Sequence, residues 1–254
     1  MYSTCKSQLR LEMWHVFCSH CVMKVAFVSG TSIVNSDLFS EWEARSATTK
    51  YGTVGYKARG EHVILNRHGT GVPKPPHAIN YRANIRALAD LGFTDVVSLN
   101  SVGSLRLNLT PGTIVSCGDY VCLQDGPRTF FDDELRGGSA GIDNNLIPML
   151  VEKLAPEFEI QTGKVYVQMR GPRFETKAEI QILKNWGDVV GMTAAHEADL
   201  CSEIGLRYNS LAIIDNYANG LAGEEIDFIK FKDLVRDNQI KVNRLFARLL
   251  EVFA

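Results

Sequence analysis

An arginine and a histidine stand side by side in the run Arg67-His68-Gly69, directly after the apolar segment His62 to Asn66. A guanidinium offers paired N–H donors that match the oxygens of phosphate, and the imidazole beside it adds another donor. The turn Ser29-Gly30-Thr31-Ser32 also follows an apolar segment, and its backbone N–H groups and hydroxyls suit an anion. A surface arginine next to a histidine at the core rim would explain the first run equally well, and small-residue turns are common. Neither run is specific taken alone.

Three further polar clusters follow apolar segments. The run Gly171 to Thr176 predicts a turn leading into a helix with Glu175 in its first turn, where the helix dipole alone would favour an acidic residue. The run Asn100 to Ser104 is a glycine turn, which is also the signature of an ordinary tight turn. The last cluster combines Gly191-Met192-Thr193 with Asp215-Asn216, whose amide can both donate and accept, as contact with the edge of a heterocycle requires.

The elements that must position these clusters are short strands alternating with helices. This alternation predicts an α/β fold with a largely parallel central sheet, in which ligands bind at the carboxyl ends of strands. Helical periodicity is clearest in the C-terminal stripe Val242, Leu245, Phe246, Leu249 and Phe253, and is also present at Tyr81, Ile85 and Leu88 and over Glu175 to Trp186. The predicted strands are Lys24 to Ser29, His62 to Asn66, Asp95 to Asn100, Thr113 to Val115, Lys164 to Met169, Asp188 to Gly191 and Tyr208 to Asp215.

Length and composition are those of one globular domain. The 254 residues are 45% hydrophobic, and 27 basic against 29 acidic side chains give a formal net charge of -2. No overall field therefore draws the chain to nucleic acid or to an anionic membrane. No apolar run reaches the roughly 18 to 20 residues of a membrane span, and no secretory signal is evident, so we expect a cytoplasmic protein.

The first predicted strand begins well inside the chain. We expect a domain over residues 23 to 254, preceded by an extension of residues 1 to 22 that is disordered or a wrongly assigned start. Within the extension, Cys18 and Cys21 have the spacing of half a zinc site or a redox motif, but no second Cys or His pair follows at finger spacing. The six cysteines are too sparse for a disulfide scaffold, which predicts free thiols.

The five clusters, in this order and spacing at five strand ends, resemble the trimeric purine nucleoside phosphorylase family, which includes the methylthioadenosine and methylthioinosine phosphorylases. The resemblance extends from about Lys24 to the C-terminal helix. It implies the nucleoside phosphorylase fold, a twisted, mixed but largely parallel sheet flanked by helices, and a homotrimer or dimer of trimers. Its most specific parts are Arg67-His68-Gly69 with Pro75 to Asn84, Asn100 to Leu105 with Pro111-Gly112, and Gly171 to Thr176 with Trp186 to Thr193.

The resemblance also implies roles for individual residues. Inorganic phosphate, a co-substrate, would be held by Thr31, Arg67, His68, Asn100, Ser101 and Thr193. The nucleoside would lie against Met192 and Phe174. Glu175 would accept a hydrogen bond from the protonated ring nitrogen of a 6-oxopurine, and Asn216 would contact N7 and the oxo group. Catalytic roles would fall to Asn216, Glu175 and His68. No metal or organic cofactor is implied.

The chemistry of the reaction fits these roles. Breaking a purine glycosidic bond leaves positive charge on the sugar and negative charge on the base, so the transition state needs an anion beside the sugar and a donor to the leaving base. Phosphate supplies the anion. Asn216 would be the donor, and an oriented donor of this kind contributes about 2 to 4 kcal/mol.

Base preference depends on two positions in the same strand end. The adenine-specific branch places aspartate where Asn216 stands and a second aspartate where this chain has Ala218. A carboxylate would repel the oxo oxygen, whereas an amide can donate to it, which favours a 6-oxopurine such as hypoxanthine or guanine. Asp215 stands where threonine is usual. The apolar residues around Ile226, Phe228 and Ile229 mildly favour a methylthio group at the fifth carbon of the sugar.

Some positions depart from the family pattern and keep other functions open. They are Ser29, Ser32, Val72, Arg170 and His196, together with a shortened segment from Phe130 to Asn145. These departures motivate a catalytically weakened nucleoside-binding protein on the same scaffold. A hydrolase that uses water in place of phosphate is another alternative, and methylthioadenosine phosphorylase is the alternative within the family.

Overall fold

The computed structural model describes residues 23–30, 33, 36–123, 129–135, 141–155, 157–223, 225–226 and 228–254. The predicted extension, with Cys18 and Cys21, lies outside the described residues. So do Thr31 and Ser32 of the first small-residue turn.

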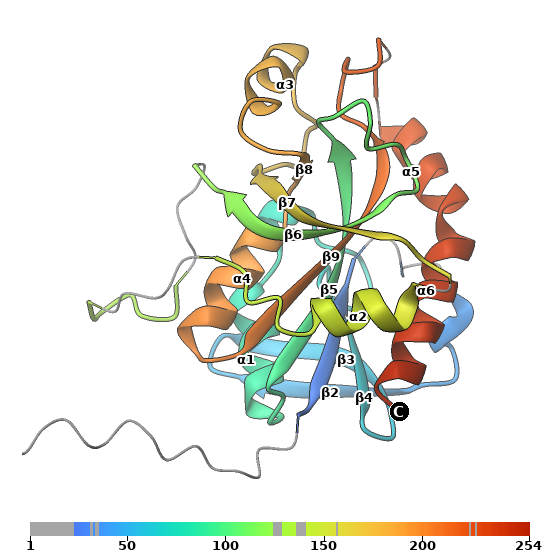
Figure 1. Ribbon diagram of the computed structural model, residues 1–254. Helices are drawn as coiled ribbons and strands as arrows, with labels where there is room; N and C mark the ends of the chain where they lie inside the picture. Colours follow the sequence, from blue (N-terminus) through green and yellow to red (C-terminus); the bar gives the residue numbers. More distant parts are fainter. Residues whose placement is uncertain are drawn as a thin grey trace, which may run out of the picture.

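Within the described residues, nine strands form one mixed sheet in the order β2-β3-β4-β1-β5-β8-β7-β6-β9. β9 also pairs with β5, so β5, β8, β7, β6 and β9 form a closed cycle (Figure 1). Parallel pairs are β1–β4, β1–β5, β5–β9, β6–β7 and β7–β8, and the remaining pairs are antiparallel. The strands are β1 (Val25–Ser29), β2 (Glu43–Thr49), β3 (Gly52–Arg59), β4 (His62–Asn66), β5 (Asp95–Ser104), β6 (Ile114–Val121), β7 (Ile160–Gln168), β8 (Val189–Gly191) and β9 (Arg207–Tyr217).

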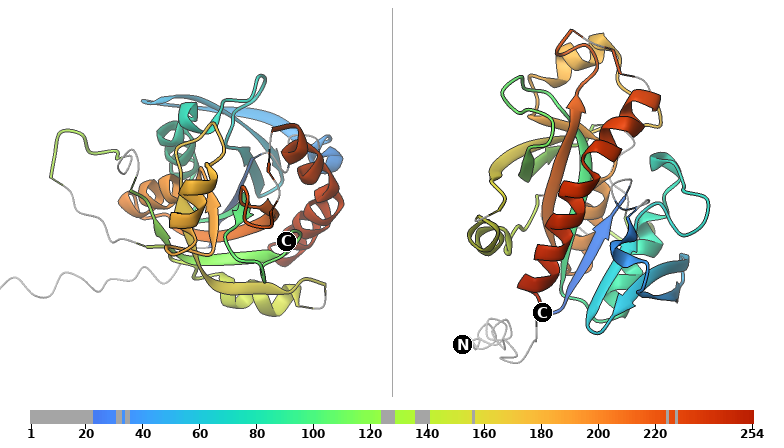
Figure 2. Two further views of the ribbon diagram at one scale, coloured as in Figure 1. Left: turned by 90° about the horizontal axis from the view of Figure 1, so that it is seen from above. Right: turned by 90° about the vertical axis from the view of Figure 1, so that its right-hand side faces the viewer.

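Helices cover both faces of the sheet. Neighbouring strand residues point to opposite faces, so Val97 and Leu99 join a core with α2 (Ile147–Leu154) and α6 (Gln239–Val252), while Val96 joins a core with α1 (Tyr81–Asp90) and α4 (Ala194–Glu203). α1 and α4 lie side by side, as do α2 and α6 (Figure 2). The remaining helices are α3 (Lys177–Leu183) and α5 (Phe228–Asp237).

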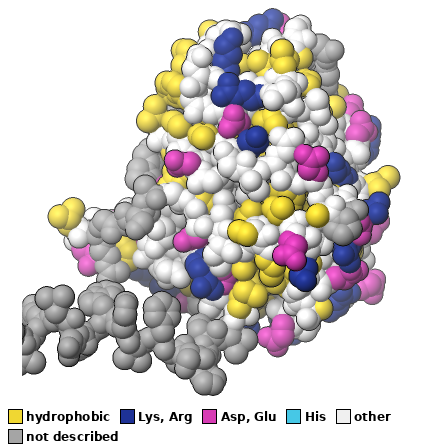
Figure 3. Space-filling model, viewed as in Figure 1, with side chains coloured by type: hydrophobic (Ala, Val, Ile, Leu, Met, Phe, Trp, Pro, Cys, Tyr) yellow, Lys and Arg dark blue, Asp and Glu magenta, His cyan; other side chains and the backbone are white. Residues whose placement is uncertain are grey.

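The surface carries charges of both signs. Figure 3 shows basic and acidic side chains interspersed on one face, in keeping with the formal net charge of -2. Among the described helices, none is both long enough and apolar enough to cross a membrane.

The predicted α/β class is confirmed, and every predicted strand has a counterpart. Two strands were missed: β2 is mostly exposed and polar, and β3, although its buried residues alternate, contains glycine at positions 52 and 55. Three helices, α2, α4 and α5, were also missed. Two predictions were wrong in detail. The run Asn100 to Ser104, predicted as a glycine turn, forms the last residues of β5. α3 begins at Lys177 with Thr176 as its N-cap, so Glu175 precedes the helix and the helix dipole does not explain it.

Candidate functional site

Arg67 follows the end of β4 and points into the protein. Its Nε donates to Oε1 of Glu197 at 2.6 Å, and its Nη2 donates to the Ser98 hydroxyl at 2.6 Å and approaches Glu197 Oε2 at 3.3 Å. Nη1 donates to the carbonyl oxygen of Leu99 at 3.0 Å. Burial alone would lower the pKa of Arg67, but the charge of Glu197 and its hydrogen bond raise it. The guanidinium is therefore a fixed cation with few donors left for a ligand.

His68 lies beside Arg67, and both side chains approach Gly30. A Cβ on Gly30 would sit 2.8 Å from Nη1 of Arg67 and 2.9 Å from Nε2 of His68, so only glycine leaves room for both groups here. The Nδ1 atom of His68 bonds the carbonyl oxygen of Lys74 at 2.7 Å, and a carbonyl only accepts. Burial, followed by the charge of Arg67, lowers the pKa of His68. The neutral ring therefore carries its proton on Nδ1 and leaves a lone pair on Nε2, so His68 faces a ligand as an acceptor and not as the donor that the sequence predicts.

A polar network extends from this pair to the end of β8. Ser98 lies within 2.8 Å of Glu197 and 3.1 Å of Asn100, and the amide of Asn100 donates to the Thr193 hydroxyl at 2.9 Å. β8 runs antiparallel to the end of β5, with Gly103 opposite Val190, so the chain after β8 returns alongside Asn100. The structure therefore brings together Arg67, His68, Asn100 and Thr193, four of the predicted phosphate residues.

Ser101 is different from its neighbours. Its hydroxyl is buried and has no hydrogen-bond partner that meets distance and angle criteria within the described part of the chain. The hydroxyl faces Asp215. It lowers the pKa of that carboxyl group, but the larger effect of burial raises it. Because its hydroxyl faces Asp215, Ser101 would contact an anion through its backbone.

The turn after β7 packs against the predicted sugar contact. Gly171 has φ of +66°, and a Cβ there would lie 2.5 Å from the Sδ atom of Met192. The hydroxyl of Tyr81 donates to the carbonyl oxygen of Met192 at 3.2 Å. Met192 is therefore held between this turn and α1, one residue before Thr193.

Glu175 lines a cavity of about 390 Å³ in the same region. The cavity is also lined by His77, Met169, Arg170, Gly171, Pro172 and Arg173. Glu175 is 5% exposed, and burial raises its pKa to about 6. Its neighbour Phe174 packs edge-on against Phe231 of α5, with ring centroids 5.4 Å apart. A buried carboxyl group and an aromatic ring therefore follow one another in the segment whose Gly171 approaches Met192.

Asn216 lies inside β9 rather than after it, because the strand continues to Tyr217. It pairs with Gly103, and a Cβ on that glycine would lie 3.3 Å from both the Nδ2 atom of Asn216 and a methyl group of Val190. Nδ2 donates to the carbonyl oxygen of Tyr217 at 2.7 Å. Because Gly103 follows Asn100 by three residues, the amide lies about 10 Å along β5 from the polar network.

Known proteins were compared with this chain. Residues 25–251 match the family described as "Phosphorylase superfamily". The chain belongs to the phosphorylase superfamily.

Relatives of this phosphorylase have names that specify purine substrates. The "6-oxopurine nucleoside phosphorylase" of Pyrococcus furiosus is 33% identical over 245 residues, covering 87% of this chain and 90% of the relative. The "Probable S-methyl-5'-thioinosine phosphorylase" of Methanocaldococcus jannaschii is 36% identical over 230 residues, covering 86% and 88%. The methylthioadenosine phosphorylase of Schistosoma mansoni, solved in complex with adenine, superposes with a TM-score of 0.78 at 26% identity, covering 91% and 92%. The resemblance inferred from the sequence is confirmed.

Some residues of this phosphorylase that hold the site together were not predicted. Glu197, Ser98 and Tyr208 surround Arg67, and the Tyr208 hydroxyl donates to Glu197 at 2.8 Å. A carboxylate in the first turn of a helix and a serine inside a buried strand give no signal of their own, because each is common in such positions. The pairing of Glu197 with Arg67 across 130 positions appears only in the folded chain.

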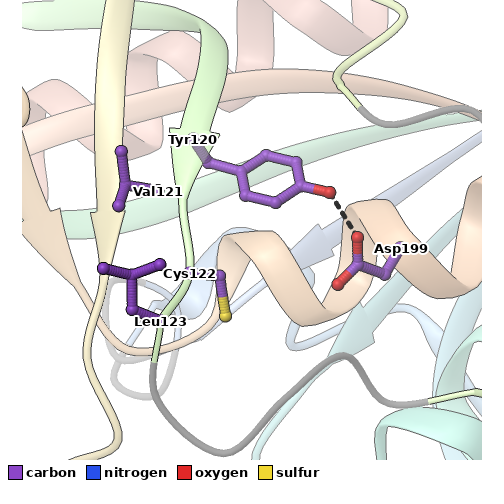
Figure 4. A pocket seen from close by; sticks show the side chains of 5 residues that line it. All are labelled: Tyr120, Val121, Cys122, Leu123 and Asp199. Atoms are coloured by element: carbon purple, nitrogen blue, oxygen red, sulfur yellow. Dashed lines mark hydrogen bonds between the residues drawn. The ribbon is translucent and has the colours of Figure 1, made fainter.

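A second cavity of about 390 Å³ lies between β6 and α4 of the phosphorylase. It is lined by Tyr120, Val121, Cys122, Leu123 and Asp199. Figure 4 shows the hydroxyl of Tyr120, from β6, pointing at the carboxylate of Asp199 on α4, to which it donates a hydrogen bond. None of the predicted site residues lines this cavity.

Proposed function

We propose that the chain cleaves the glycosidic bond of a 6-oxopurine nucleoside with inorganic phosphate. One observation supports the proposal: the structure brings Arg67, His68, Asn100 and Thr193 together into a cationic polar network that reaches Gly30. In the proposed site this network is the first end, which binds phosphate, and Glu175 and Asn216 form the second end, which binds the base. Thr31 and the backbone of Ser101 complete the proposed phosphate site.

The reaction follows from this arrangement. The bond between the anomeric carbon and N9 of the base breaks, and its electron pair moves into the purine. Asn216 donates to the base as negative charge develops there, and phosphate stabilises the cationic sugar. An oxygen of hydrogen phosphate then bonds the anomeric carbon to give the sugar 1-phosphate, and the purine anion takes up the proton that the phosphate releases and leaves as the free base. Met192 supports the sugar, and His68 orients the phosphate.

A 6-oxopurine suits the second end better than adenine. Its ring nitrogen N1 carries a hydrogen that an ionised Glu175 accepts, and its oxo oxygen accepts from the amide of Asn216. Relatives at 33 to 36% identity have names that specify 6-oxopurine nucleosides or methylthioinosine. The methylthio alternative has its own support, because Ile226 is half-buried close to Asn219, whose amide donates to the carbonyl oxygen of Glu175.

An activity panel tests the proposal. Release of base from inosine, guanosine, methylthioinosine, adenosine and methylthioadenosine is measured by chromatography with phosphate present or absent. We expect release that requires phosphate and is fastest for 6-oxopurines. Release without phosphate would identify a hydrolase, binding without release a nucleoside-binding protein, and a preference for methylthioadenosine the other branch of the family.

The finer expectations are a homotrimer or dimer of trimers located in the cytoplasm, working without metal or organic cofactor. Light scattering of the purified chain measures the assembly. We expect activity to survive dialysis against a chelator. Loss of activity would contradict the expectation that no metal is needed.

A further inference from the structure

Near Asn216, strand β9 contains one residue more than its partner strand β5. Val102 of β5 pairs with Ile214, but the next residue, Gly103, pairs with Asn216, so Asp215 has no partner in the register. Such a β-bulge re-aims the side chains that follow it. Side chains alternate between faces with a period of two, so removing the extra residue would turn Asn216 to the opposite face. The bulge at Asp215 therefore decides where the Asn216 amide points.

The side chain of Asp215 is tied to the junction of two helices. Asp215 is 1% exposed, and its Oδ1 accepts from the amide of Asn238 at 2.8 Å. Asn238 lies between the last residue of α5 and the first residue of α6, and its amide is also 3.5 Å from the carbonyl oxygen of Ile214. The Ser101 hydroxyl faces the carboxyl group of Asp215, and neither this hydroxyl nor Oδ2 of Asp215 has a hydrogen-bond partner among the described residues.

Stability does not account for a carboxyl group in this place. Burying a carboxylate costs free energy unless hydrogen bonds or a counter-charge satisfy it, and here the groups that act on Asp215 are an amide and a hydroxyl. An apolar residue of similar size would fill the space without this cost. What the carboxyl group provides is a hydrogen bond that fixes the bulge to Asn238.

The same junction positions another part of the site. α5 ends at Asp237, immediately before Asn238, and carries Phe231, which packs against Phe174. On the other side of the bulge, the backbone of Ile214 bonds Thr113 at 3.0 Å and Gly112 at 2.7 Å. The bulge is therefore held from both sides, by the loop before β6 and by the α5–α6 junction.

We propose that Asp215 is a positioning residue: with Asn238 it clamps the bulge in β9, and the clamp holds the Asn216 amide in the orientation that contacts the departing base. This inference rests on the proposed function for the identity of the ligand. The geometry of the bulge and its clamp does not depend on that function.

A set of variants tests the clamp in steady-state kinetics with inosine and phosphate. We expect Asp215→Ala and Asn238→Ala each to lower kcat/KM for the nucleoside by about tenfold to a hundredfold, because the donor is misplaced. KM for phosphate should change by less than about twofold, because Asp215 faces the hydroxyl of Ser101, whereas the proposed phosphate contact of Ser101 is made by its backbone. Asp215→Asn should rescue most of the loss, since its Oδ1 still accepts from Asn238 and its amide can donate to Ser101.

A double variant separates positioning from general damage to the fold. If Asp215 acts through Asn216, then Asp215→Ala should cost nothing further in an Asn216→Ala background, whereas an independent structural role would make the two losses add. Asn243→Ala is the matched control, because Asn243 is an asparagine of α6 that bonds Ser36 and Gln239 instead of the bulge. Additive losses, or an Asp215→Asn variant as impaired as Asp215→Ala, would overturn the proposal.

A crystal structure of Asp215→Ala distinguishes this inference from the proposed function. A displaced or rotated Asn216 amide supports the clamp even if the wild-type chain releases no base from any nucleoside. An amide in its wild-type position overturns the clamp even if the wild-type chain is an active phosphorylase. Melting temperatures of all variants show which of them fold.

Discussion

The Nε atom of Arg67 lies 2.6 Å from Oε1 of Glu197, and both side chains are 2% exposed. Such a buried pair makes each partner depend on the other, because losing one leaves an uncompensated charge. We expect Glu197→Gln to lower the free energy of unfolding by about 3 to 5 kcal/mol. Chemical denaturation measures the change. Glu157→Gln, which removes ion pairs near the surface with Arg244 and Arg248, should cost about 1 kcal/mol or less. Equal losses in the two variants would contradict the role assigned to burial.

The space above Gly30 tests the phosphate site. Gly30→Ala places a methyl group 2.8 Å from Arg67 Nη1 and 2.9 Å from His68 Nε2, so one of them must move. We expect KM for phosphate to rise about tenfold or more, with KM for the nucleoside little changed. Gly118→Ala is the control, because the nearest atom to its Cβ would be 3.9 Å away. An unchanged KM for phosphate in Gly30→Ala would place the anion elsewhere.

Ionisation of Glu175 predicts the acid limb of the pH profile. Burial raises its pKa from 4.5 to about 6, so the carboxylate that accepts from the base is lost as the pH falls through 6. We expect kcat/KM for inosine to fall about tenfold per pH unit below that point. Glu175→Gln should lower activity and abolish the limb. The neighbouring variant Glu179→Gln should retain it, because the pKa of Glu179 is about 2.

Protonation of Asp215 predicts a pH-dependent stability. Burial raises its pKa from 3.8 to about 6, so the folded chain binds this proton more tightly than the unfolded chain does. The group's contribution to the free energy of unfolding is therefore present below about pH 4 and declines as the pH rises to about 6, by about 3 kcal/mol in total. Asp215→Asn removes this dependence, so its stability relative to wild type should increase between pH 4 and 7.5. Thermal melts at both pH values measure it, and exposed Asp119→Asn serves as the control.

Replacing Asn216 with aspartate tests base recognition. A carboxylate repels the oxo oxygen of hypoxanthine and accepts from the amino group of adenine, so the preference between inosine and adenosine should shift toward adenosine by about tenfold or more. The ratio of kcat/KM values measures the shift. An unchanged ratio would remove Asn216 from the base site.

Much of the architecture could be predicted because each cluster followed a strand with a clear apolar signal. Arg67 and His68 were found from their residue types and their place after β4. Strand ends were less accurate: β5 and β9 extend beyond their predicted ends, because glycine and polar residues near the site interrupt the apolar pattern without interrupting the pairing.

The support of the site could not be predicted in the same way. Glu197 contacts Arg67 from a distant helix, and nothing in its own neighbourhood indicates the pairing. The bulge at Asp215 depends on a register shift between two strands, which local sequence does not encode. These contacts join residues that are far apart in the sequence, so they appear only in the folded chain. The residue types that can carry chemistry, by contrast, can be read directly from the sequence.

The hydrogen bond from His68 to the carbonyl oxygen of Lys74 has a consequence for the choice between anions. A neutral ring that keeps its proton on Nδ1 offers only an electron pair to whatever binds beside Gly30. Hydrogen phosphate can meet that electron pair with its own hydroxyl hydrogen, while sulfate at neutral pH has none to give. We therefore expect this tautomer to favour hydrogen phosphate over sulfate, a tetrahedral dianion of nearly equal size.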